Sequence, residues 1–167
     1  MFTKKLEIFF LSVIVIAILV LSKNYYDSYI FKTNDIPDSY KQRIVNKEQE
    51  VLQLMQSHYG FSFRVPVIVT DKFKGRLYGI TAYKNGEIRI YLNKKVMQES
   101  MDYMVDSVIA HEYAHALIFK LGMRDVEKEG HSKEWQQACV NLGGVNCEQY
   151  VNSHDVVMGK LPFNNGK

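Results

Sequence analysis

The sequence is poor in the residues that mark several common classes of protein. Its 167 residues include only two cysteines, three prolines and one tryptophan, and its formal net charge is only +3. Two cysteines are too few for a small domain held together mainly by disulfides. A collagen-like or disordered chain is excluded because 47% of the residues are apolar and glycine and proline are scarce. The small net charge excludes the strongly basic proteins that coat nucleic acids.

A long apolar run occurs at the N-terminus, where thirteen of the fourteen residues in 8–21 are apolar. At 1.5 Å per residue this run covers about 21 Å of helix, so its flanks must contribute to span the roughly 30 Å hydrocarbon core. Lys4 and Lys5 precede the run, and Tyr25 and Tyr26 follow it as anchors for the membrane interface. The layout is typical of a secretory signal peptide or of a signal anchor that is not cleaved.

We expect residues 1–23 to be an uncleaved transmembrane signal anchor that contacts the membrane through residues 6–22. The anchor is favoured over a cleaved signal peptide because 20–22 match a cleavage site only weakly. A buried core helix is a further alternative. The positive-inside rule predicts a cytoplasmic N-terminus and an extracytoplasmic C-terminal domain. The margin is thin because basic residues also follow the span, namely Lys23, Lys32, Lys41 and Arg43.

The rest of the chain predicts a linker over 24–36 and one α+β domain over 37–167, with a small mixed or antiparallel sheet against a helix. Asn85-Gly86 favours a type I′ turn and therefore a hairpin of two strands. Ser100 and Ser132 are the expected N-caps of two helices. The expected elements are helices over 37–58, 101–121 and 133–142, an edge strand over 65–70, and hairpin strands over 77–83 and 87–92.

The chemistry is concentrated in His111-Glu112-Tyr113-Ala114-His115, an HExxH motif inside the second of these helices. Histidines four residues apart share one helical face, so both imidazoles can bind one Zn²⁺. Zinc lowers the pKa of a bound water towards neutrality, and Glu112 is placed to take its proton as general base. Apolar residues on both sides of the motif predict a buried helix. Burying unpaired polar groups costs free energy, so two histidines and a glutamate in such a helix indicate a functional role.

Catalytic zinc requires a third protein ligand, and the sequence offers two candidates. His131 directly precedes the cap of the third helix and is the candidate that we favour. Glu134, one turn into that helix, is the alternative and would make a gluzincin-type hydrolase. Leu121 stands where a metzincin would carry its third histidine, so the metzincin pattern is excluded.

The stretch from His111 to Gly144 resembles the SprT-like family of zinc metalloproteases. That family includes Spartan, a protease that cleaves proteins crosslinked to DNA. The features that agree in order are HExxH, a charged loop, Gly130-His131, and Trp135 four residues later. The resemblance covers about Tyr40 to Gly144. It implies a zincin-like fold, zinc bound by His111, His115 and His131, Glu112 as base, and a protein or peptide substrate. The membrane segment and the lack of a zinc ribbon depart from the pattern and put a DNA-linked substrate in doubt.

Residues 70–95, which we call the basic hairpin region, carry seven bases against two acids. This charge predicts either an ordinary solvated hairpin or a surface for DNA, anionic lipid or an acidic partner. A non-catalytic zinc-containing binding module that uses this surface is therefore the rival to a peptidase. The sequence leaves two further possibilities open, namely a disulfide between Cys139 and Cys147, if the domain is extracytoplasmic, and an oxyanion contact from Tyr83.

Overall fold

The computed structural model describes residues 2–73, 77–123 and 131–148 of the chain. The chain divides into two compact units, Met1–Asp35 and Ile36–Lys167. The first unit is helix α1, which runs from Phe2 to Thr33. Its part from Lys4 to Thr33 is long and apolar enough to cross a membrane, as a signal sequence near the N-terminus also is. Residues 24–33 of the expected linker are helical and continue α1.

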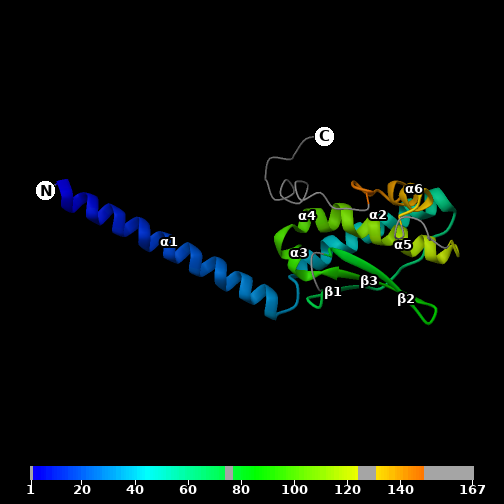
Figure 1. Ribbon diagram of the computed structural model, residues 1–167, viewed down its shortest axis with the longest axis horizontal. Helices are drawn as coiled ribbons and strands as arrows, with labels where there is room; N and C mark the ends of the chain where they lie inside the picture. The colour runs from blue at the N-terminus through cyan, green and yellow to red at the C-terminus, as the bar shows by residue number, and fades with distance from the viewer. Residues whose placement is uncertain (1, 74–76, 124–130, 149–167) are drawn as a thin grey trace. The chain divides into compact units, whose positions relative to one another are not determined.

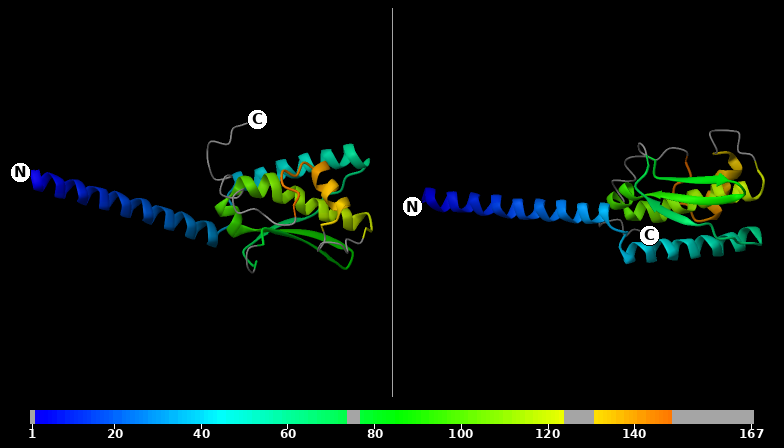
Figure 2. Two further views of the ribbon diagram at one scale, coloured as in Figure 1. Left: turned by 45° about the horizontal axis from the view of Figure 1, so that its top comes forward. Right: turned by 90° about the horizontal axis from the view of Figure 1, so that it is seen from below.

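The second unit contains the remaining elements and is an α+β domain, as expected. Its elements in chain order are α2 (Asp38–Tyr59), β1 (Val67–Thr70), β2 (Gly79–Lys84), β3 (Glu87–Asn93), α3 (Lys94–Glu99), α4 (Met101–Tyr103), the π-helical turn η1 (Met104–Val108), α5 (Ile109–Lys120) and α6 (Lys133–Asn141). Figures 1 and 2 show the helices of this unit gathered on one face of the sheet.

The sheet has three strands in the order β1-β3-β2, with β1 parallel and β2 antiparallel to β3. It is therefore a mixed sheet, and β1 lies at an edge, as the proline before it led us to expect. The hairpin turn is also confirmed, because Asn85 and Gly86 both have positive φ, at 53° and 82°. Two consecutive positive φ angles define the type I′ turn, whose twist matches that of the strands it joins.

The predicted second helix differs from the structure at its N-terminal end. A short helix, α3, precedes it, and its N-cap is Asn93, whose side chain accepts a hydrogen bond from the backbone N–H of Lys95 at 3.0 Å. Ser100 stands at the N-cap position of α4, as expected, but its side chain makes no capping hydrogen bond. Its hydroxyl is buried at the junction of α3 and α4 and has no partner among the described residues.

Helices α4, η1 and α5 follow one another along Met101–Lys120 and form the centre of the domain core. Helix α5 contacts β2 and β3 on one side and α2 and α6 on others. Ile109, Ala114 and Leu117 are fully buried in it. The π-helical turn adds a residue to one helical turn directly before the HExxH motif, a place where such turns are common in functional sites. The motif thus lies in a rigid element packed on several sides.

Helix α6 begins and ends as a set of local contacts. Ser132 accepts a hydrogen bond from the backbone N–H of Trp135 at 3.2 Å, which confirms the predicted cap. Cys139 and Cys147 form a disulfide, a pairing that the sequence left open. Gly144 passes so close to both sulfurs that a Cβ there would lie 2.5 Å from the Sγ of Cys139. A residue larger than glycine would therefore displace this disulfide.

Candidate metal centre

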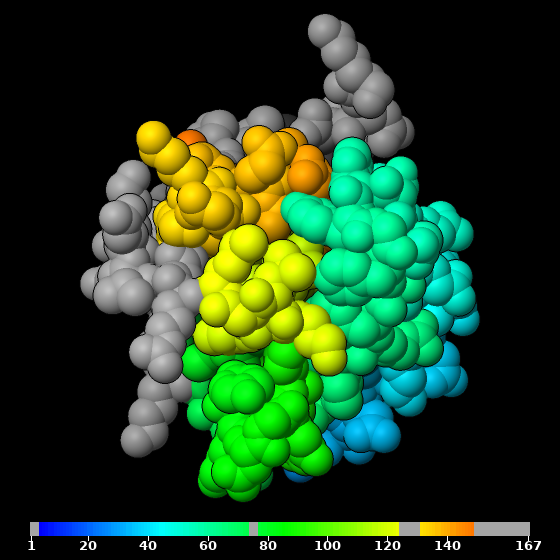
Figure 3. Space-filling view, turned by 90° about the vertical axis from the view of Figure 1, so that its right-hand side faces the viewer, coloured from blue at the N-terminus to red at the C-terminus, as the bar shows by residue number. Residues whose placement is uncertain are grey.

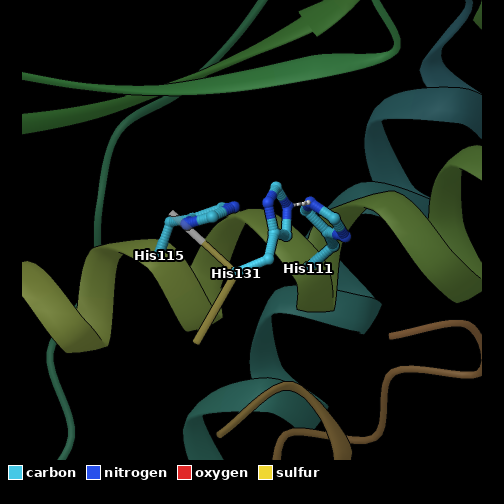
Figure 4. Close-up of side chains that lie close together, drawn as sticks. All are labelled: His111, His115 and His131. Carbon is cyan, nitrogen blue, oxygen red and sulfur yellow. Dashed lines mark hydrogen bonds between the residues drawn. The ribbon is translucent and has the colours of Figure 1, made fainter. Parts of the chain in front are cut away.

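Three histidines that the sequence separates by up to twenty residues lie together above α5. His111 and His115 come from two successive turns of α5, and His131 comes from the residue before the Ser132 cap of α6. One ligand nitrogen from each histidine lies within 4.8 Å of the others. Figure 4 shows the ring of His131 between those of His111 and His115. The described residues thus bring together the three imidazoles that the sequence nominated as metal ligands.

The donor set fits a zinc ion in its chemistry, and one pair of its nitrogens has the spacing of a zinc site. Imidazole nitrogens bind zinc at about 2.0–2.1 Å, so two of them in a tetrahedral site lie roughly 3.3 Å apart. The Nε2 atoms of His111 and His131 are 3.2 Å apart. Burial, with the nearby His131 as a smaller cause, lowers the pKa of His111 to about 4. Burial likewise lowers the pKa of His115 to about 3. Both rings are therefore neutral at pH 7, the form that binds metal.

Trp135 forms the floor of this centre. Its ring centroid lies 4.6 Å from that of His111, 5.0 Å from that of His115 and 4.3 Å from that of His131. The side chain is almost fully buried and is the only tryptophan in the chain. The aromatic residue four positions after His131 therefore packs against all three imidazoles at once. We therefore expect its fluorescence to change when a metal ion binds to the three histidines.

Glu134, the alternative third ligand, lies apart from the group that the histidines form. It is exposed in the first turn of α6, where the structure pairs it with the cap rather than with the imidazoles. Hydrogen bonds from its own backbone N–H and from Ser132 lower the pKa of its carboxyl. Gly130, which belongs to the same sequence motif, lies outside the described residues. The geometry thus favours His131 over Glu134.

Glu112, the residue after His111 on α5, lies against strand β2. Its side chain is only 4% exposed. The hydroxyl of Thr81 lies 2.7 Å from Glu112 Oε2 and 2.8 Å from the Glu112 backbone oxygen. Since one hydroxyl carries one proton, Thr81 donates to one of these oxygens at a time. Burial raises the pKa of Glu112 to about 7, and the Thr81 hydrogen bonds oppose that rise.

Gly79, two residues before Thr81 on the same face of β2, makes this close approach possible. A Cβ at Gly79 would lie 2.7 Å from Glu112 Oε1 and 2.9 Å from a methyl group of Val108. Any other residue there would displace the carboxylate or spread the strand from the helix. Sequence reasoning missed both Gly79 and Thr81, although the Gly-x-Thr spacing on one strand face was a usable signal.

For the peptide cleavage proposed below, we expect Thr81→Val to lower kcat/KM about tenfold, because it removes a hydrogen bond that orients Glu112 and is worth roughly 1–1.5 kcal/mol. It should also move the acidic limb of the pH profile upward, since the lost donor favoured the charged carboxylate. Thr81→Ser keeps the hydroxyl and should stay near the original activity. An unchanged rate and pH profile in the valine variant would show that Thr81 does not position Glu112.

The opposite face of α5 is held by Tyr113, the residue between Glu112 and Ala114. Its hydroxyl donates to Glu48 Oε1 of α2 at 2.8 Å and lies 3.4 Å from the backbone N–H of Val65, which donates to it. Both side chains are buried. Burial, together with the Glu48 contact, raises the pKa of Tyr113. Tyr113 therefore fixes the motif helix against α2. In the sequence, the sign of this contact is Glu48, a glutamate among the buried residues of α2.

Tyr83, which the sequence left open as an oxyanion donor, contacts an aromatic ring in the structure. It lies on the same face of β2 as Gly79 and Thr81, and its ring stacks on that of Phe119 with centroids 5.9 Å apart. The oxyanion role stays a prediction. In the basic hairpin region, Lys74 and Arg76 lie outside the residues that the structure describes. Arg89 of this region forms an ion pair with Glu87.

Fold and site together define an α+β domain with a buried HExxH helix and a three-histidine cluster able to hold a metal ion. The SprT-like family model matches residues 48–155, most of this domain, and the chain belongs to the SprT-like family. It is similar to Protein SprT of Serratia proteamaculans, with 30% identity over 105 residues, 63% of this chain and 59% of that protein. Protein SprT of Actinobacillus succinogenes is 27% identical over 110 residues, 66% of this chain and 61% of that protein. The chain thus spans about three fifths of the length of these relatives.

Proposed function

We propose that this chain is a membrane-anchored, zinc-dependent metallopeptidase of SprT-like type with a zincin-like catalytic domain. The observation that carries the proposal is that three histidine imidazoles converge beside Glu112, a buried glutamate of the helix that carries two of them. His111, His115 and His131 would hold the zinc ion. Zinc bound there would polarise the peptide carbonyl and acidify water. The partner is then an unfolded protein or a peptide.

The role of Glu112 follows from its position and its pKa. As water attacks the peptide carbonyl carbon, Glu112 takes one proton from it and then gives that proton to the leaving amine nitrogen as the C–N bond breaks. Burial raises the pKa of Glu112 in the metal-free domain, which favours a carboxyl that can return the proton as well as take it. Thr81 holds the carboxyl against β2 so that its reach is fixed.

Removal of the metal tests the proposal directly. We expect dialysis of the full chain, in detergent, against a chelator to reduce cleavage of an unfolded protein to background. Zn²⁺ should restore it, whereas Mg²⁺ and Ca²⁺ should not, because both prefer oxygen ligands over imidazole. The Trp135 fluorescence should change in step with the activity. Full activity in the chelated protein would refute a zinc-dependent reaction.

A non-catalytic binding module remains the rival, and the burial of Glu112 argues against it. A scaffold that only held zinc would need the histidines and would gain nothing from a buried carboxyl, which costs free energy to keep there. The rival predicts salt-dependent DNA binding through the basic hairpin region and no cleavage of any unfolded protein. Those two results together would replace the peptidase proposal.

We further propose that α1 anchors the domain on the extracytoplasmic side of the membrane. The Cys139–Cys147 disulfide supports this side, because disulfides persist in oxidising compartments and are rare in the cytosol. We expect the chain to stay in the membrane fraction in alkaline carbonate, and protease added to intact spheroplasts to degrade the domain. Protection of the domain until the membrane is opened would place it in the cytoplasm.

A further inference from the structure

We infer that Tyr83 and Phe119 form a subsite that binds a large apolar or aromatic side chain of the substrate close to the scissile bond. The inference rests on the proposed peptidase function and names the kind of peptide that the site selects. The Tyr83 and Phe119 rings stack with an angle of 25° between their planes. We call these two residues the aromatic pair.

The position of Phe119 on α5 places the aromatic pair beside the candidate catalytic residues. At about 100° per residue, Phe119 falls between His115 and Glu112 around the helix, in line with the groups that would face a substrate. It is one turn, roughly 6 Å, beyond His115 along the helix axis. An extended peptide advances about 3.3 Å per residue, so the pair lies two or three residues from the scissile bond.

Strand β2 supplies the other half of the pair by the same periodicity. Gly79, Thr81 and Tyr83 share one face of β2, and the first two approach Glu112. Tyr83 is the next residue on that face and meets Phe119 further along α5. The face of β2 that contacts Glu112 therefore also carries Tyr83 of the aromatic pair. A peptide extended along β2, which ends the sheet among the described strands, would pass both.

Both members of the aromatic pair are exposed to solvent. Tyr83 is 59% and Phe119 42% exposed, although the described core of the domain buries tyrosine and tryptophan almost completely. Figure 3 shows the end of α5, in yellow, at the surface beside the green atoms of the hairpin. Adjacent aromatic rings left in water next to a functional site are typical of a surface that a ligand covers.

The occupant is an apolar side chain of the substrate rather than a charged one. Both rings offer apolar faces, and covering them removes apolar surface from water. We expect a phenylalanine at the matching position to bind roughly tenfold tighter than an alanine. Peptides with aromatic or large aliphatic residues near the cleavage point are therefore the preferred substrates.

The test uses binding, so that its outcome does not depend on cleavage. The full-length, zinc-loaded Glu112→Gln variant in detergent is titrated with fluorescent peptides that carry one phenylalanine or alanine, moved in turn along the sequence. We expect a roughly tenfold preference for phenylalanine at one or two positions by fluorescence anisotropy. Adding Tyr83→Ala or Phe119→Ala should abolish the preference and leave zinc binding, read from Trp135, unchanged.

Ile80→Ala provides the matched control, since Ile80 is 46% exposed and lies on the opposite face of the same strand. It should retain the preference. Equal affinity for both peptides at every position, or a preference that survives Phe119→Ala or is lost in Ile80→Ala, would overturn the subsite. The two proposals fail separately: cleavage absent from the unmodified protein would refute the peptidase, whereas the binding preference tests the aromatic pair.

Discussion

Glu112→Gln should lower peptide cleavage by about a thousandfold while the protein keeps its zinc. Glutamine has the size of glutamate and can still accept the hydrogen bond from Thr81, but it cannot take a proton from water. General base catalysis typically contributes a factor of about 10²–10⁴, which sets the expected loss. Steady-state cleavage of an unfolded protein, with zinc content measured in parallel, checks this result. Glu87→Gln, an exposed change on the hairpin, is the control and should keep full activity.

The pH dependence of folding stability separates this loss from damage to the fold. The folded pKa of Glu112 is about 7, above the value of 4.5 for an unperturbed glutamate. The stability it contributes is therefore fully present below pH 4.5 and is lost as pH rises through 7. An amide cannot ionise, so metal-free Glu112→Gln should be more stable than the original at pH 8, by on the order of 3 kcal/mol. An equal or lower stability at pH 8, or unchanged cleavage, would contradict the role given to Glu112.

His131→Ala should weaken zinc binding by more than about a hundredfold. Loss of a residue that only supports a ligand costs roughly 10–100-fold in affinity, so loss of a direct ligand costs more. Trp135 contacts the ring of His131 at 4.3 Å, and titration of zinc against a competing chelator can be followed by its fluorescence. Cleavage at limiting zinc should fall together with the affinity.

Glu134→Ala is the matched change on the next helix and should leave the zinc affinity unchanged. Glu134 is exposed beside Ser132, where its carboxyl interacts with the start of α6. If the glutamate variant lost zinc and the histidine variant kept it, the site would be of gluzincin type and His131 would not be the third ligand. The two single variants are enough to decide, because each candidate ligand predicts zinc loss in a different one of them.

Much of the site was predictable because it depends on local periodicity. His111 and His115 share a helical face by their spacing alone, and the buried surroundings of the motif were visible in its apolar neighbours. The Asn85-Gly86 turn and the Ser132 cap were predictable for the same reason, since each depends on residues within a few positions. The sequence favoured His131 over Glu134, but only the fold brings its Nε2 to 3.2 Å from that of His111.

The errors arose where neighbouring elements compete for the same residues. Ser100 has the composition of an N-cap, yet α3 ends there and the hydroxyl is buried between two helices. The aromatic stretch 24–33 lacks an amphipathic period, yet it continues α1 because nothing in it breaks a helix. Composition indicates what a segment can form, and its neighbours decide which possibility is used.

The sequence by itself determined the apolar N-terminal helix, the hairpin, and the helix that presents two histidines and a glutamate. These depend on backbone geometry that repeats every two or about 3.6 residues. Only the tertiary structure decided that Gly79 and Thr81 enclose Glu112, that Trp135 lies under three imidazoles, and that Tyr83 meets Phe119. These contacts join residues far apart in the chain, and they depend on how β2 and α6 pack against α5. That packing follows from burial of the whole core rather than from any local pattern.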